Sequence, residues 1–198
     1  MNEANHWVET VPGGQTELRV AVLMRREAVQ GPMARWQPWR WTLHEVLIHQ
    51  AGFGPQPRCM RDGDDGALWI YPDWPVTLYP DDAEGYWLNT TAPAPAFFVM
   101  WRMSEPEDGS EPRAVPHEVS LSYHDAGRWL DAQETVETSP APAAVVQWAH
   151  AFALQHFVPE PKKRQRPQSF QRLTDRFGQP VSISTEGKRR GGSGGGGT

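Results

Sequence analysis

Short segments typical of β-strands fill residues 18–122 of this chain, and helical patterns appear only after them. The predicted strands are residues 18–24, 36–48, 67–71, 76–79, 96–101 and 117–122, with residues 86–89 as a further short candidate. Consecutive strands followed by helices are typical of α+β domains. The sequence therefore predicts an α+β fold with a curved antiparallel sheet or small open barrel.

Two of these strands have informative patterns. The apolar residues of segment 18–24 are nearly continuous, which favours a strand covered on both faces. In segment 39–44 large apolar residues alternate with polar ones, so that Trp39 and Trp41 share one face. The aromatic rings of this segment should therefore lie together on one side of the sheet.

One short and one longer helix are predicted near the end of the domain. Ser122 and Asp125 have the spacing of a capping box, which places a short helix over residues 125–131. Ser139 is a candidate N-cap for a longer helix with proline in its first turn, ending before Pro159. The residues that should share its apolar face are Val145, Trp148, Ala149 and Phe152.

The domain organisation follows from changes in composition. Residues 1–17 are expected to be a flexible N-terminal extension, and residues 18–158 a single α+β domain of ordinary size. Residues 159–198 lack an apolar period and end in a glycine-rich run, which indicates a flexible, disordered tail.

Charge divides at the same boundary. Residues 1–158 contain ten Arg and no Lys against twenty-one acidic residues, whereas residues 159–198 contain nine basic and three acidic residues. The basic tail could meet another protein, RNA or the acidic body of its own chain, or its charge could simply keep it solvated.

A docking element is predicted within the tail, at residues 169–178. Phe170, Leu173 and Phe177 are spaced by three and four residues, and Gly178 follows as a helix stop. Three apolar side chains on one helical face suit a groove on a partner. The same element could instead fold back on its own domain, and the sequence leaves both alternatives open.

Several function classes lack sequence support. No apolar run approaches the ~20 residues of a membrane span, and the N-terminus has no secretory signal pattern, so a cytoplasmic protein is expected. Cys59 is the single cysteine, with ordinary packing as its expected role. The chain shows no nucleophile elbow, phosphate-binding loop or metal-ligand spacing, and we expect neither catalysis nor a cofactor.

Tryptophan and arginine are concentrated at the second predicted strand. Trp36, Trp39 and Trp41 follow one another closely, and guanidinium groups stack readily on such rings. The nearby arginines are Arg25, Arg26, Arg35 and Arg40. The rings could pack in the core, form a ligand platform or mediate protein binding, since Trp and Arg are enriched at interfaces.

Longer motifs add a resemblance. They are Met24-Arg-Arg-Glu27, the cluster 36–41, Leu78-Tyr79 with Ala83-Glu-Gly-Tyr-Trp-Leu-Asn89, Val119-Ser-Leu-Ser-Tyr-His-Asp-Ala126, and Trp148 to Pro161. Over residues 18–165 the chain resembles the bacterial domain-of-unknown-function family 3305. Members of that family are often encoded near formate dehydrogenase genes, which implies an accessory, assembly or small-subunit role.

The sequence and the resemblance together give a functional hypothesis. We expect a noncatalytic protein that binds a larger protein, with a molybdenum- or tungsten-dependent formate dehydrogenase as the implied partner. The expected contact residues are Arg25, Arg26, Trp36, Trp39, Phe170, Leu173 and Phe177. The alternative is a small-molecule-binding domain or enzyme with a Trp- and Arg-lined pocket. No membrane partner is expected, and the acidic body disfavours nucleic acid.

Overall fold

The computed structural model describes residues 15–105 and 111–158. The strands in this part are β1 (Glu17–Ala28), β2 (Trp39–Ile48), β3 (Arg58–Gly63), β4 (Gly66–Thr77), β5 (Ala96–Met103), β6 (Ala114–Ser120) and β7 (Thr135–Pro140). The helices are α1 (Ala83–Thr90), α2 (Tyr123–Asp131) and α3 (Ala143–His156), with 3₁₀ turns η2 (Pro32–Arg35), η3 (Ala51–Phe53) and η4 (Pro80–Asp82). None of these described helices has the length and apolar character that a membrane crossing requires.

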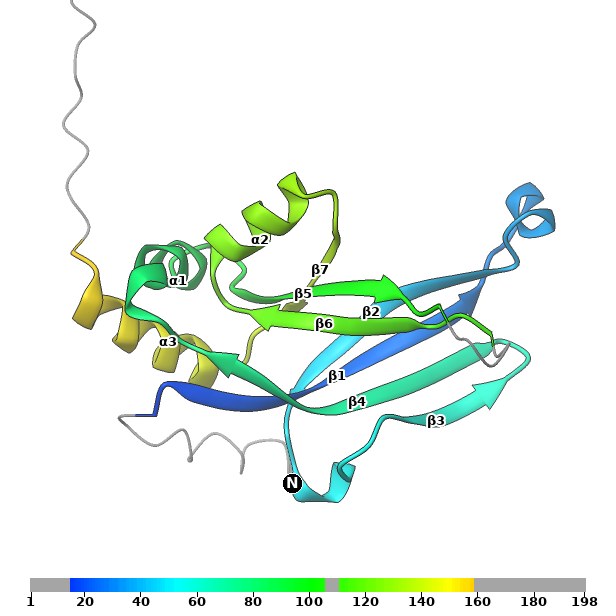
Figure 1. The fold of residues 1–198 in the computed structure, drawn as a ribbon, viewed down its shortest axis with the longest axis horizontal. Helices are drawn as coiled ribbons and strands as arrows, with labels where there is room; N and C mark the ends of the chain where they lie inside the picture. The colour runs from blue at the N-terminus through cyan, green and yellow to red at the C-terminus, as the bar shows by residue number, and fades with distance from the viewer. Residues whose placement is uncertain (1–14, 106–110, 159–198) are drawn as a thin grey trace, which may run out of the picture. The chain divides into compact units, whose positions relative to one another are not determined.

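The strands form two antiparallel sheets. One has the order β2-β1-β4-β3 and the other the order β6-β5-β7. The sheets are not closed into one barrel, and β7 lies beside β2 while β6 lies beside β4 (Figure 1). The predicted α+β class with an open antiparallel architecture is therefore confirmed, together with a short and a longer helix at its end.

Side chains of β7 join it to the edge of β2. A carboxylate oxygen of Glu137 accepts hydrogen bonds from the Leu43 backbone N–H and, at 3.2 Å, from Nε1 of Trp101. The buried Ser139 hydroxyl accepts the Val46 N–H at 3.0 Å. These bonds satisfy backbone donors of β2 that have no strand partner on that side. Ser139 was therefore wrongly predicted as a helix cap, because it belongs to β7, and α3 begins after Pro142.

A buried tyrosine makes the corresponding link between β4 and β6. The Tyr71 hydroxyl donates a hydrogen bond of 2.8 Å to the Ala114 carbonyl oxygen. Burial raises the pKa of Tyr71 to about 12, so the phenol remains a donor at neutral pH.

The main core lies between the sheets and extends to the helices. Val20, Val22 and Met24 of β1 are fully buried there with Phe97 of β5. From α3, Val145, Ala149 and Phe152 are buried in the same core, and Trp148 packs against it, as predicted. A smaller cluster on the opposite face of β1 contains Ala21, Leu23 and Ile70. Both faces of β1 are therefore covered, which explains its nearly continuous apolar sequence.

The remaining differences from the predicted elements have local causes. β4 runs without a break through Pro72 and Pro75, where two strands had been expected. Proline is tolerated there because this half of β4 extends beyond β3 and has an unpaired edge. Residues 86–89 lie in helix α1 and not in a strand. Cys59 is exposed on β3, so its predicted packing role is wrong.

The capping box of α2 is confirmed in a modified form. The Ser122 hydroxyl accepts the N–H groups of His124 and Asp125, and the helix begins at Tyr123. The Asp125 carboxylate does not reach the Ser122 N–H directly. It accepts the Ser120 hydroxyl at 2.5 Å, and the Ser120 oxygen accepts the Ser122 N–H at 2.9 Å.

Gly66 gives a stability prediction at the β3–β4 turn. Its φ is +136°, and an added Cβ would lie 2.0 Å from the backbone oxygen of Arg26. Gly66→Ala should therefore lower the free energy of unfolding by about 2–4 kcal/mol. The matched control is Gly63→Ala, whose Cβ would lie 3.2 Å from a side-chain oxygen of Asp65 and 4.0 Å from the backbone oxygen of Gly66. Urea unfolding of both variants measures the difference, and equal stabilities would contradict this turn geometry.

Candidate functional site

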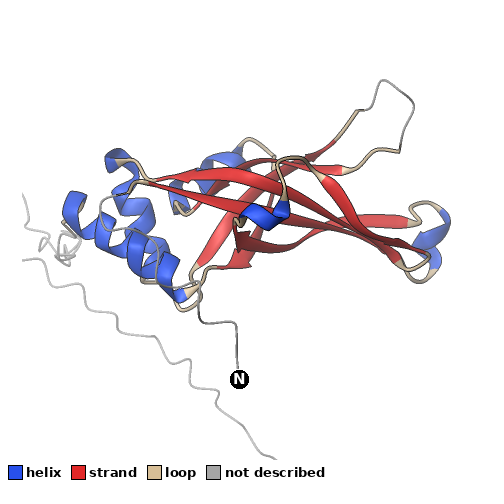
Figure 2. Cartoon of the chain, turned by 90° about the horizontal axis from the view of Figure 1, so that it is seen from below, coloured by secondary structure: helices blue, strands red, loops and turns tan. Residues whose placement is uncertain are grey.

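Three connections that are distant in the sequence lie at the same end of the two sheets, opposite helices α1 and α3 (Figures 1 and 2). They are the β1–β2 connection (29–38), the β3–β4 turn (64–65) and the β5–β6 connection, described at 104–105 and 111–113. We call the surface formed by these connections and the adjoining strand ends the loop end. It contains the four contact residues predicted on the domain.

The β1–β2 connection displays large apolar side chains. Pro32 begins η2, and Gly31 before it has a φ of +86°, a conformation that glycine adopts readily. This turn leaves Trp36 80% exposed and Met33 61% exposed. The Arg35 guanidinium lies 5.9 Å from the Trp36 ring centre. Trp, Met and Arg are the residue types that are enriched at protein interfaces.

Arg26 and Trp39 form a stacked pair on the inner face of the first sheet. The Arg26 guanidinium lies 4.6 Å from the Trp39 ring centre, and the Arg26 side chain is only 17% exposed. It forms ion pairs with Asp62 at 3.3 Å and Glu111 at 2.7 Å. Within the described residues its buried Nε has no hydrogen-bond partner. The predicted stacking of an arginine on the tryptophan cluster is therefore confirmed for Arg26 and Trp39. The positive charge of Arg26 is balanced by the carboxylates of Asp62 and Glu111.

A second stacked pair adjoins the first. The Arg113 guanidinium lies 4.6 Å from the Trp69 ring centre. Between Arg26, Trp41, Trp69 and Arg113 lies a cavity of about 190 Å³. Pockets for small organic ligands usually have volumes of about 300–1,000 Å³, so this Trp- and Arg-lined cavity is small for that purpose.

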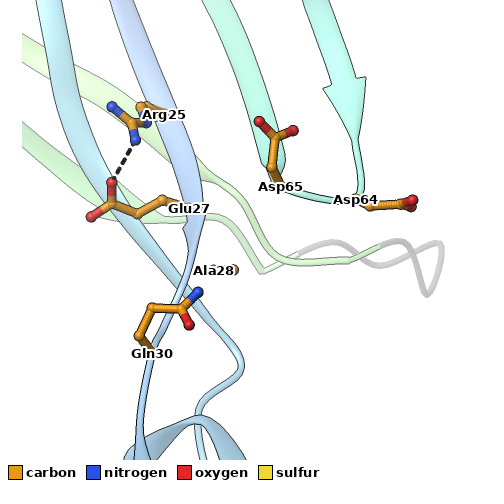
Figure 3. A pocket seen from close by; sticks show the side chains of 6 residues that line it. All are labelled: Arg25, Glu27, Ala28, Gln30, Asp64 and Asp65. Atoms are coloured by element: carbon orange, nitrogen blue, oxygen red, sulfur yellow. Dashed lines mark ion pairs between the residues drawn. The ribbon is translucent and has the colours of Figure 1, made fainter.

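An open hollow lies on the outer face of the same end. Its volume is about 530 Å³, and it is lined by Arg25, Glu27, Ala28, Gln30, Asp64 and Asp65 (Figure 3). Arg25 pairs with Glu27 at 3.0 Å, and Glu27 also bonds Arg40. The hydrogen bond from Arg40 holds the pKa of Glu27 below its usual value. Asp64 and Asp65 of the β3–β4 turn also line this hollow, so its lining carries charges of both signs.

The predicted contact residues are therefore distributed over different parts of the loop end. Arg26 and Trp39 touch each other inside, Trp36 lies at the tip, and Arg25 is on the outer face. Phe170, Leu173 and Phe177 lie outside the described residues. Met33 and Arg113 also lie at the loop end and were not predicted as contact residues. The position of Met33, three residues before Trp36, could have indicated it.

The tryptophans mostly lie at the margin of the core. In the described part of the chain Trp101 is the one that is buried, while Trp41, Trp69, Trp74, Trp87 and Trp148 pack against the core from its edge. The same part contains no group of three His, Cys, Asp or Glu side chains placed to hold a metal ion.

Fold and site together define an α+β domain of two open antiparallel sheets with an aromatic- and arginine-bearing loop end. The chain belongs to the family described as protein of unknown function (DUF3305), whose model matches residues 19–166. A search of curated proteins and a search of solved structures each gave no match.

Proposed function

We propose that this protein is a noncatalytic accessory, assembly or small-subunit protein that binds a larger protein through its loop end. The observation that carries the proposal is Trp36, which is 80% exposed at the tip of the β1–β2 connection beside Met33. Trp and Arg are over-represented among the residues that dominate binding energy, and Met is also enriched at interfaces.

The size of the effect supports a binding role for this tip. Complete burial of an aromatic side chain removes about 150–250 Å² from water, at roughly 25 cal/mol per Å². Covering Trp36 would therefore supply on the order of 3–5 kcal/mol of hydrophobic transfer free energy, from which the costs of association are subtracted. Arg26 forms ion pairs with Asp62 and Glu111 and stacks on Trp39 in the free chain, so this part of the surface is formed before binding.

The proposed partner is a molybdenum- or tungsten-dependent formate dehydrogenase in the cytoplasm. This identification comes from the resemblance to a family often encoded near such enzymes. The loop end supports protein binding in general and carries no feature that selects this partner. Co-purification from cells that make the protein, with identification of the bound chains, tests the partner directly.

The small-molecule alternative rests on the cavity between Trp41, Trp69, Arg26 and Arg113. Its volume of about 190 Å³ is below the usual range for organic ligands. Asp62 and Glu111 line the cavity together with Arg26 and Arg113, so the two positive charges are offset by two negative ones. Protein binding therefore accounts for the loop end better than a ligand pocket does.

The tail gives a further prediction. Deleting residues 159–198 should leave the domain folded but weaken the complex several-fold, because this segment carries nine basic and three acidic residues. Thermal unfolding and partner affinity at two salt concentrations measure the two effects. Replacing Phe170, Leu173 and Phe177 by Ala in the full chain separates apolar docking from charge. Unchanged partner affinity after the deletion would remove the tail from the proposal.

A further inference from the structure

The outer edge of β2 is only partly covered. β2 is an edge strand of the four-stranded sheet and pairs with β1 on one side. β7 lies beside its other side, where the Leu43 N–H donates to the Glu137 carboxylate and the Val46 N–H donates to the Ser139 hydroxyl. Toward the loop end β2 continues past β7 (Figure 1). Residues 39–42 of β2 therefore have a strand on one side and no described strand on the other.

The ladder with β1 determines which backbone groups of this segment face outward. In an antiparallel pair, successive residues of a strand point their N–H and C=O groups alternately toward the partner strand and away from it. The Val29 N–H donates to the Pro38 carbonyl oxygen at 2.9 Å, so Pro38 faces β1. The register has no irregularity before Leu43, whose N–H faces β7. Trp39 and Trp41 therefore turn their backbone N–H and C=O groups away from β1, in phase with Leu43.

The two outward-facing N–H groups of Trp39 and Trp41 have no acceptor among the described residues. Farther along the same edge, side chains of β7 satisfy the corresponding donors, so the edge is covered in one half and open in the half at the loop end. An open strand edge is a template for a further strand, and many proteins bind extended peptide segments in this way. This open half follows Trp36 in the chain and carries the Trp39 ring that stacks on Arg26, so it belongs to the surface where partner binding is proposed.

We propose that the partner adds an extended segment, in which apolar and polar side chains alternate, as a further strand along residues 39–42 of β2. The inference rests on the proposed binding of a protein at the loop end. Residues of the added strand opposite Trp39 and Trp41 point their side chains to the face of the sheet that carries both rings, where aromatic or β-branched side chains pack well. The residue between them lies beside Arg40, which is exposed on the other face and suits a polar neighbour.

Hydrogen–deuterium exchange of the free full-length chain, resolved by residue, tests whether the edge is open. The amides of Trp39 and Trp41 should exchange about tenfold faster, or more, than their neighbours. The neighbours serve as internal controls, because their amides are hydrogen-bonded within the domain; they are Arg40, Thr42 and Leu43. Slow exchange of both tryptophan amides in the monomer would show that another segment of the chain covers the edge. Slow exchange that appears only as the chain concentration rises would show that a second copy covers it, and either result would overturn the proposal.

The same measurement on the complex, isolated by co-purification with the full-length chain, tests the added strand. Exchange of the Trp39 and Trp41 amides should slow about tenfold or more, because each gains an acceptor in the partner segment. A complex in which both amides exchange as in the free chain would overturn strand addition while leaving partner binding at the loop end standing. Recovery of no complex at all would contradict both.

Trp39→Pro, compared with Trp39→Ala, isolates the contribution of the backbone donor. Both variants lose the ring that stacks on Arg26, and proline in addition lacks the outward-facing N–H. Proline is tolerated at the first residue of an edge strand, so the sheet should persist in both. Trp39→Pro should bind the partner about fivefold more weakly than Trp39→Ala, which corresponds to the loss of one hydrogen bond. Equal affinities of the two variants would count against the added strand, and should Trp39→Pro fail to fold, the exchange measurements decide.

Discussion

Replacing Asn89 by aspartate is expected to lower the free energy of unfolding by about 3–5 kcal/mol. Asn89 is 1% exposed. Its Nδ2 donates to the carbonyl oxygens of Ala96 at 2.8 Å and Leu121 at 2.9 Å, and its Oδ1 accepts the Ala96 N–H at 3.1 Å. These bonds join α1 to the start of β5 and to the segment that leads into α2. A carboxylate would oppose two carbonyl oxygens with no donor between them.

The pH dependence of this variant has a definite sign. Burial and the facing carbonyls should raise the pKa of the introduced carboxyl above its unfolded value of about 4. The penalty is therefore full at neutral pH and shrinks as the pH falls through the raised pKa and the carboxyl takes up a proton. Urea unfolding at pH 7 and pH 4.5 measures this loss of stability at the two pH values. Gln147→Glu, at an exposed site on α3, is the control, and equally small losses in both variants would contradict the buried role of Asn89.

Trp36→Ala should weaken the complex with the partner by about 30-fold or more, which corresponds to roughly 2 kcal/mol or more at a dominant interface residue. The folded domain should be unaffected, within about 0.5 kcal/mol, because the ring is 80% exposed and buries little in the free chain. Calorimetric or optical measurement of partner affinity, together with urea unfolding, separates these two quantities.

The matched control for Trp36 is Leu154→Ala. Leu154 is 54% exposed on α3, at the end of the sheets opposite the loop end (Figure 2). Its removal should leave both stability and partner affinity nearly unchanged. Equal losses of affinity for the two variants would show that exposed apolar surface in general, and not the β1–β2 tip, determines binding.

Local sequence signals predicted the strands that carry apolar residues and missed those that do not. β1 and β5 were recognised because their buried residues are nearly continuous. β3 is exposed throughout, and β7 is polar, so neither has a hydrophobic period. Pairing with β4 determines β3, and the bonds of Glu137 and Ser139 help to attach β7 to β2. Such interactions link distant parts of the chain and leave no local pattern.

The loop end was predictable in composition but not in arrangement. Closely spaced tryptophans and arginines indicated a stacked cluster. Which ring would be exposed depends on η2, which places Trp36 beyond the end of β2 while Trp39 stays over Arg26. Arg26 and Glu111 are 85 residues apart, so only the approach of the two sheets brings them together.

The most direct test of partner recognition is gentle co-purification of the full-length protein from cells that naturally make it, followed by mass-spectrometric identification of the bound chains. The native chain and Leu154→Ala should both retain a subunit of a metal-dependent oxidoreductase, and Trp36→Ala should lose it. Recovery of no stable partner, or equal recovery with Trp36→Ala, would contradict binding through the loop end.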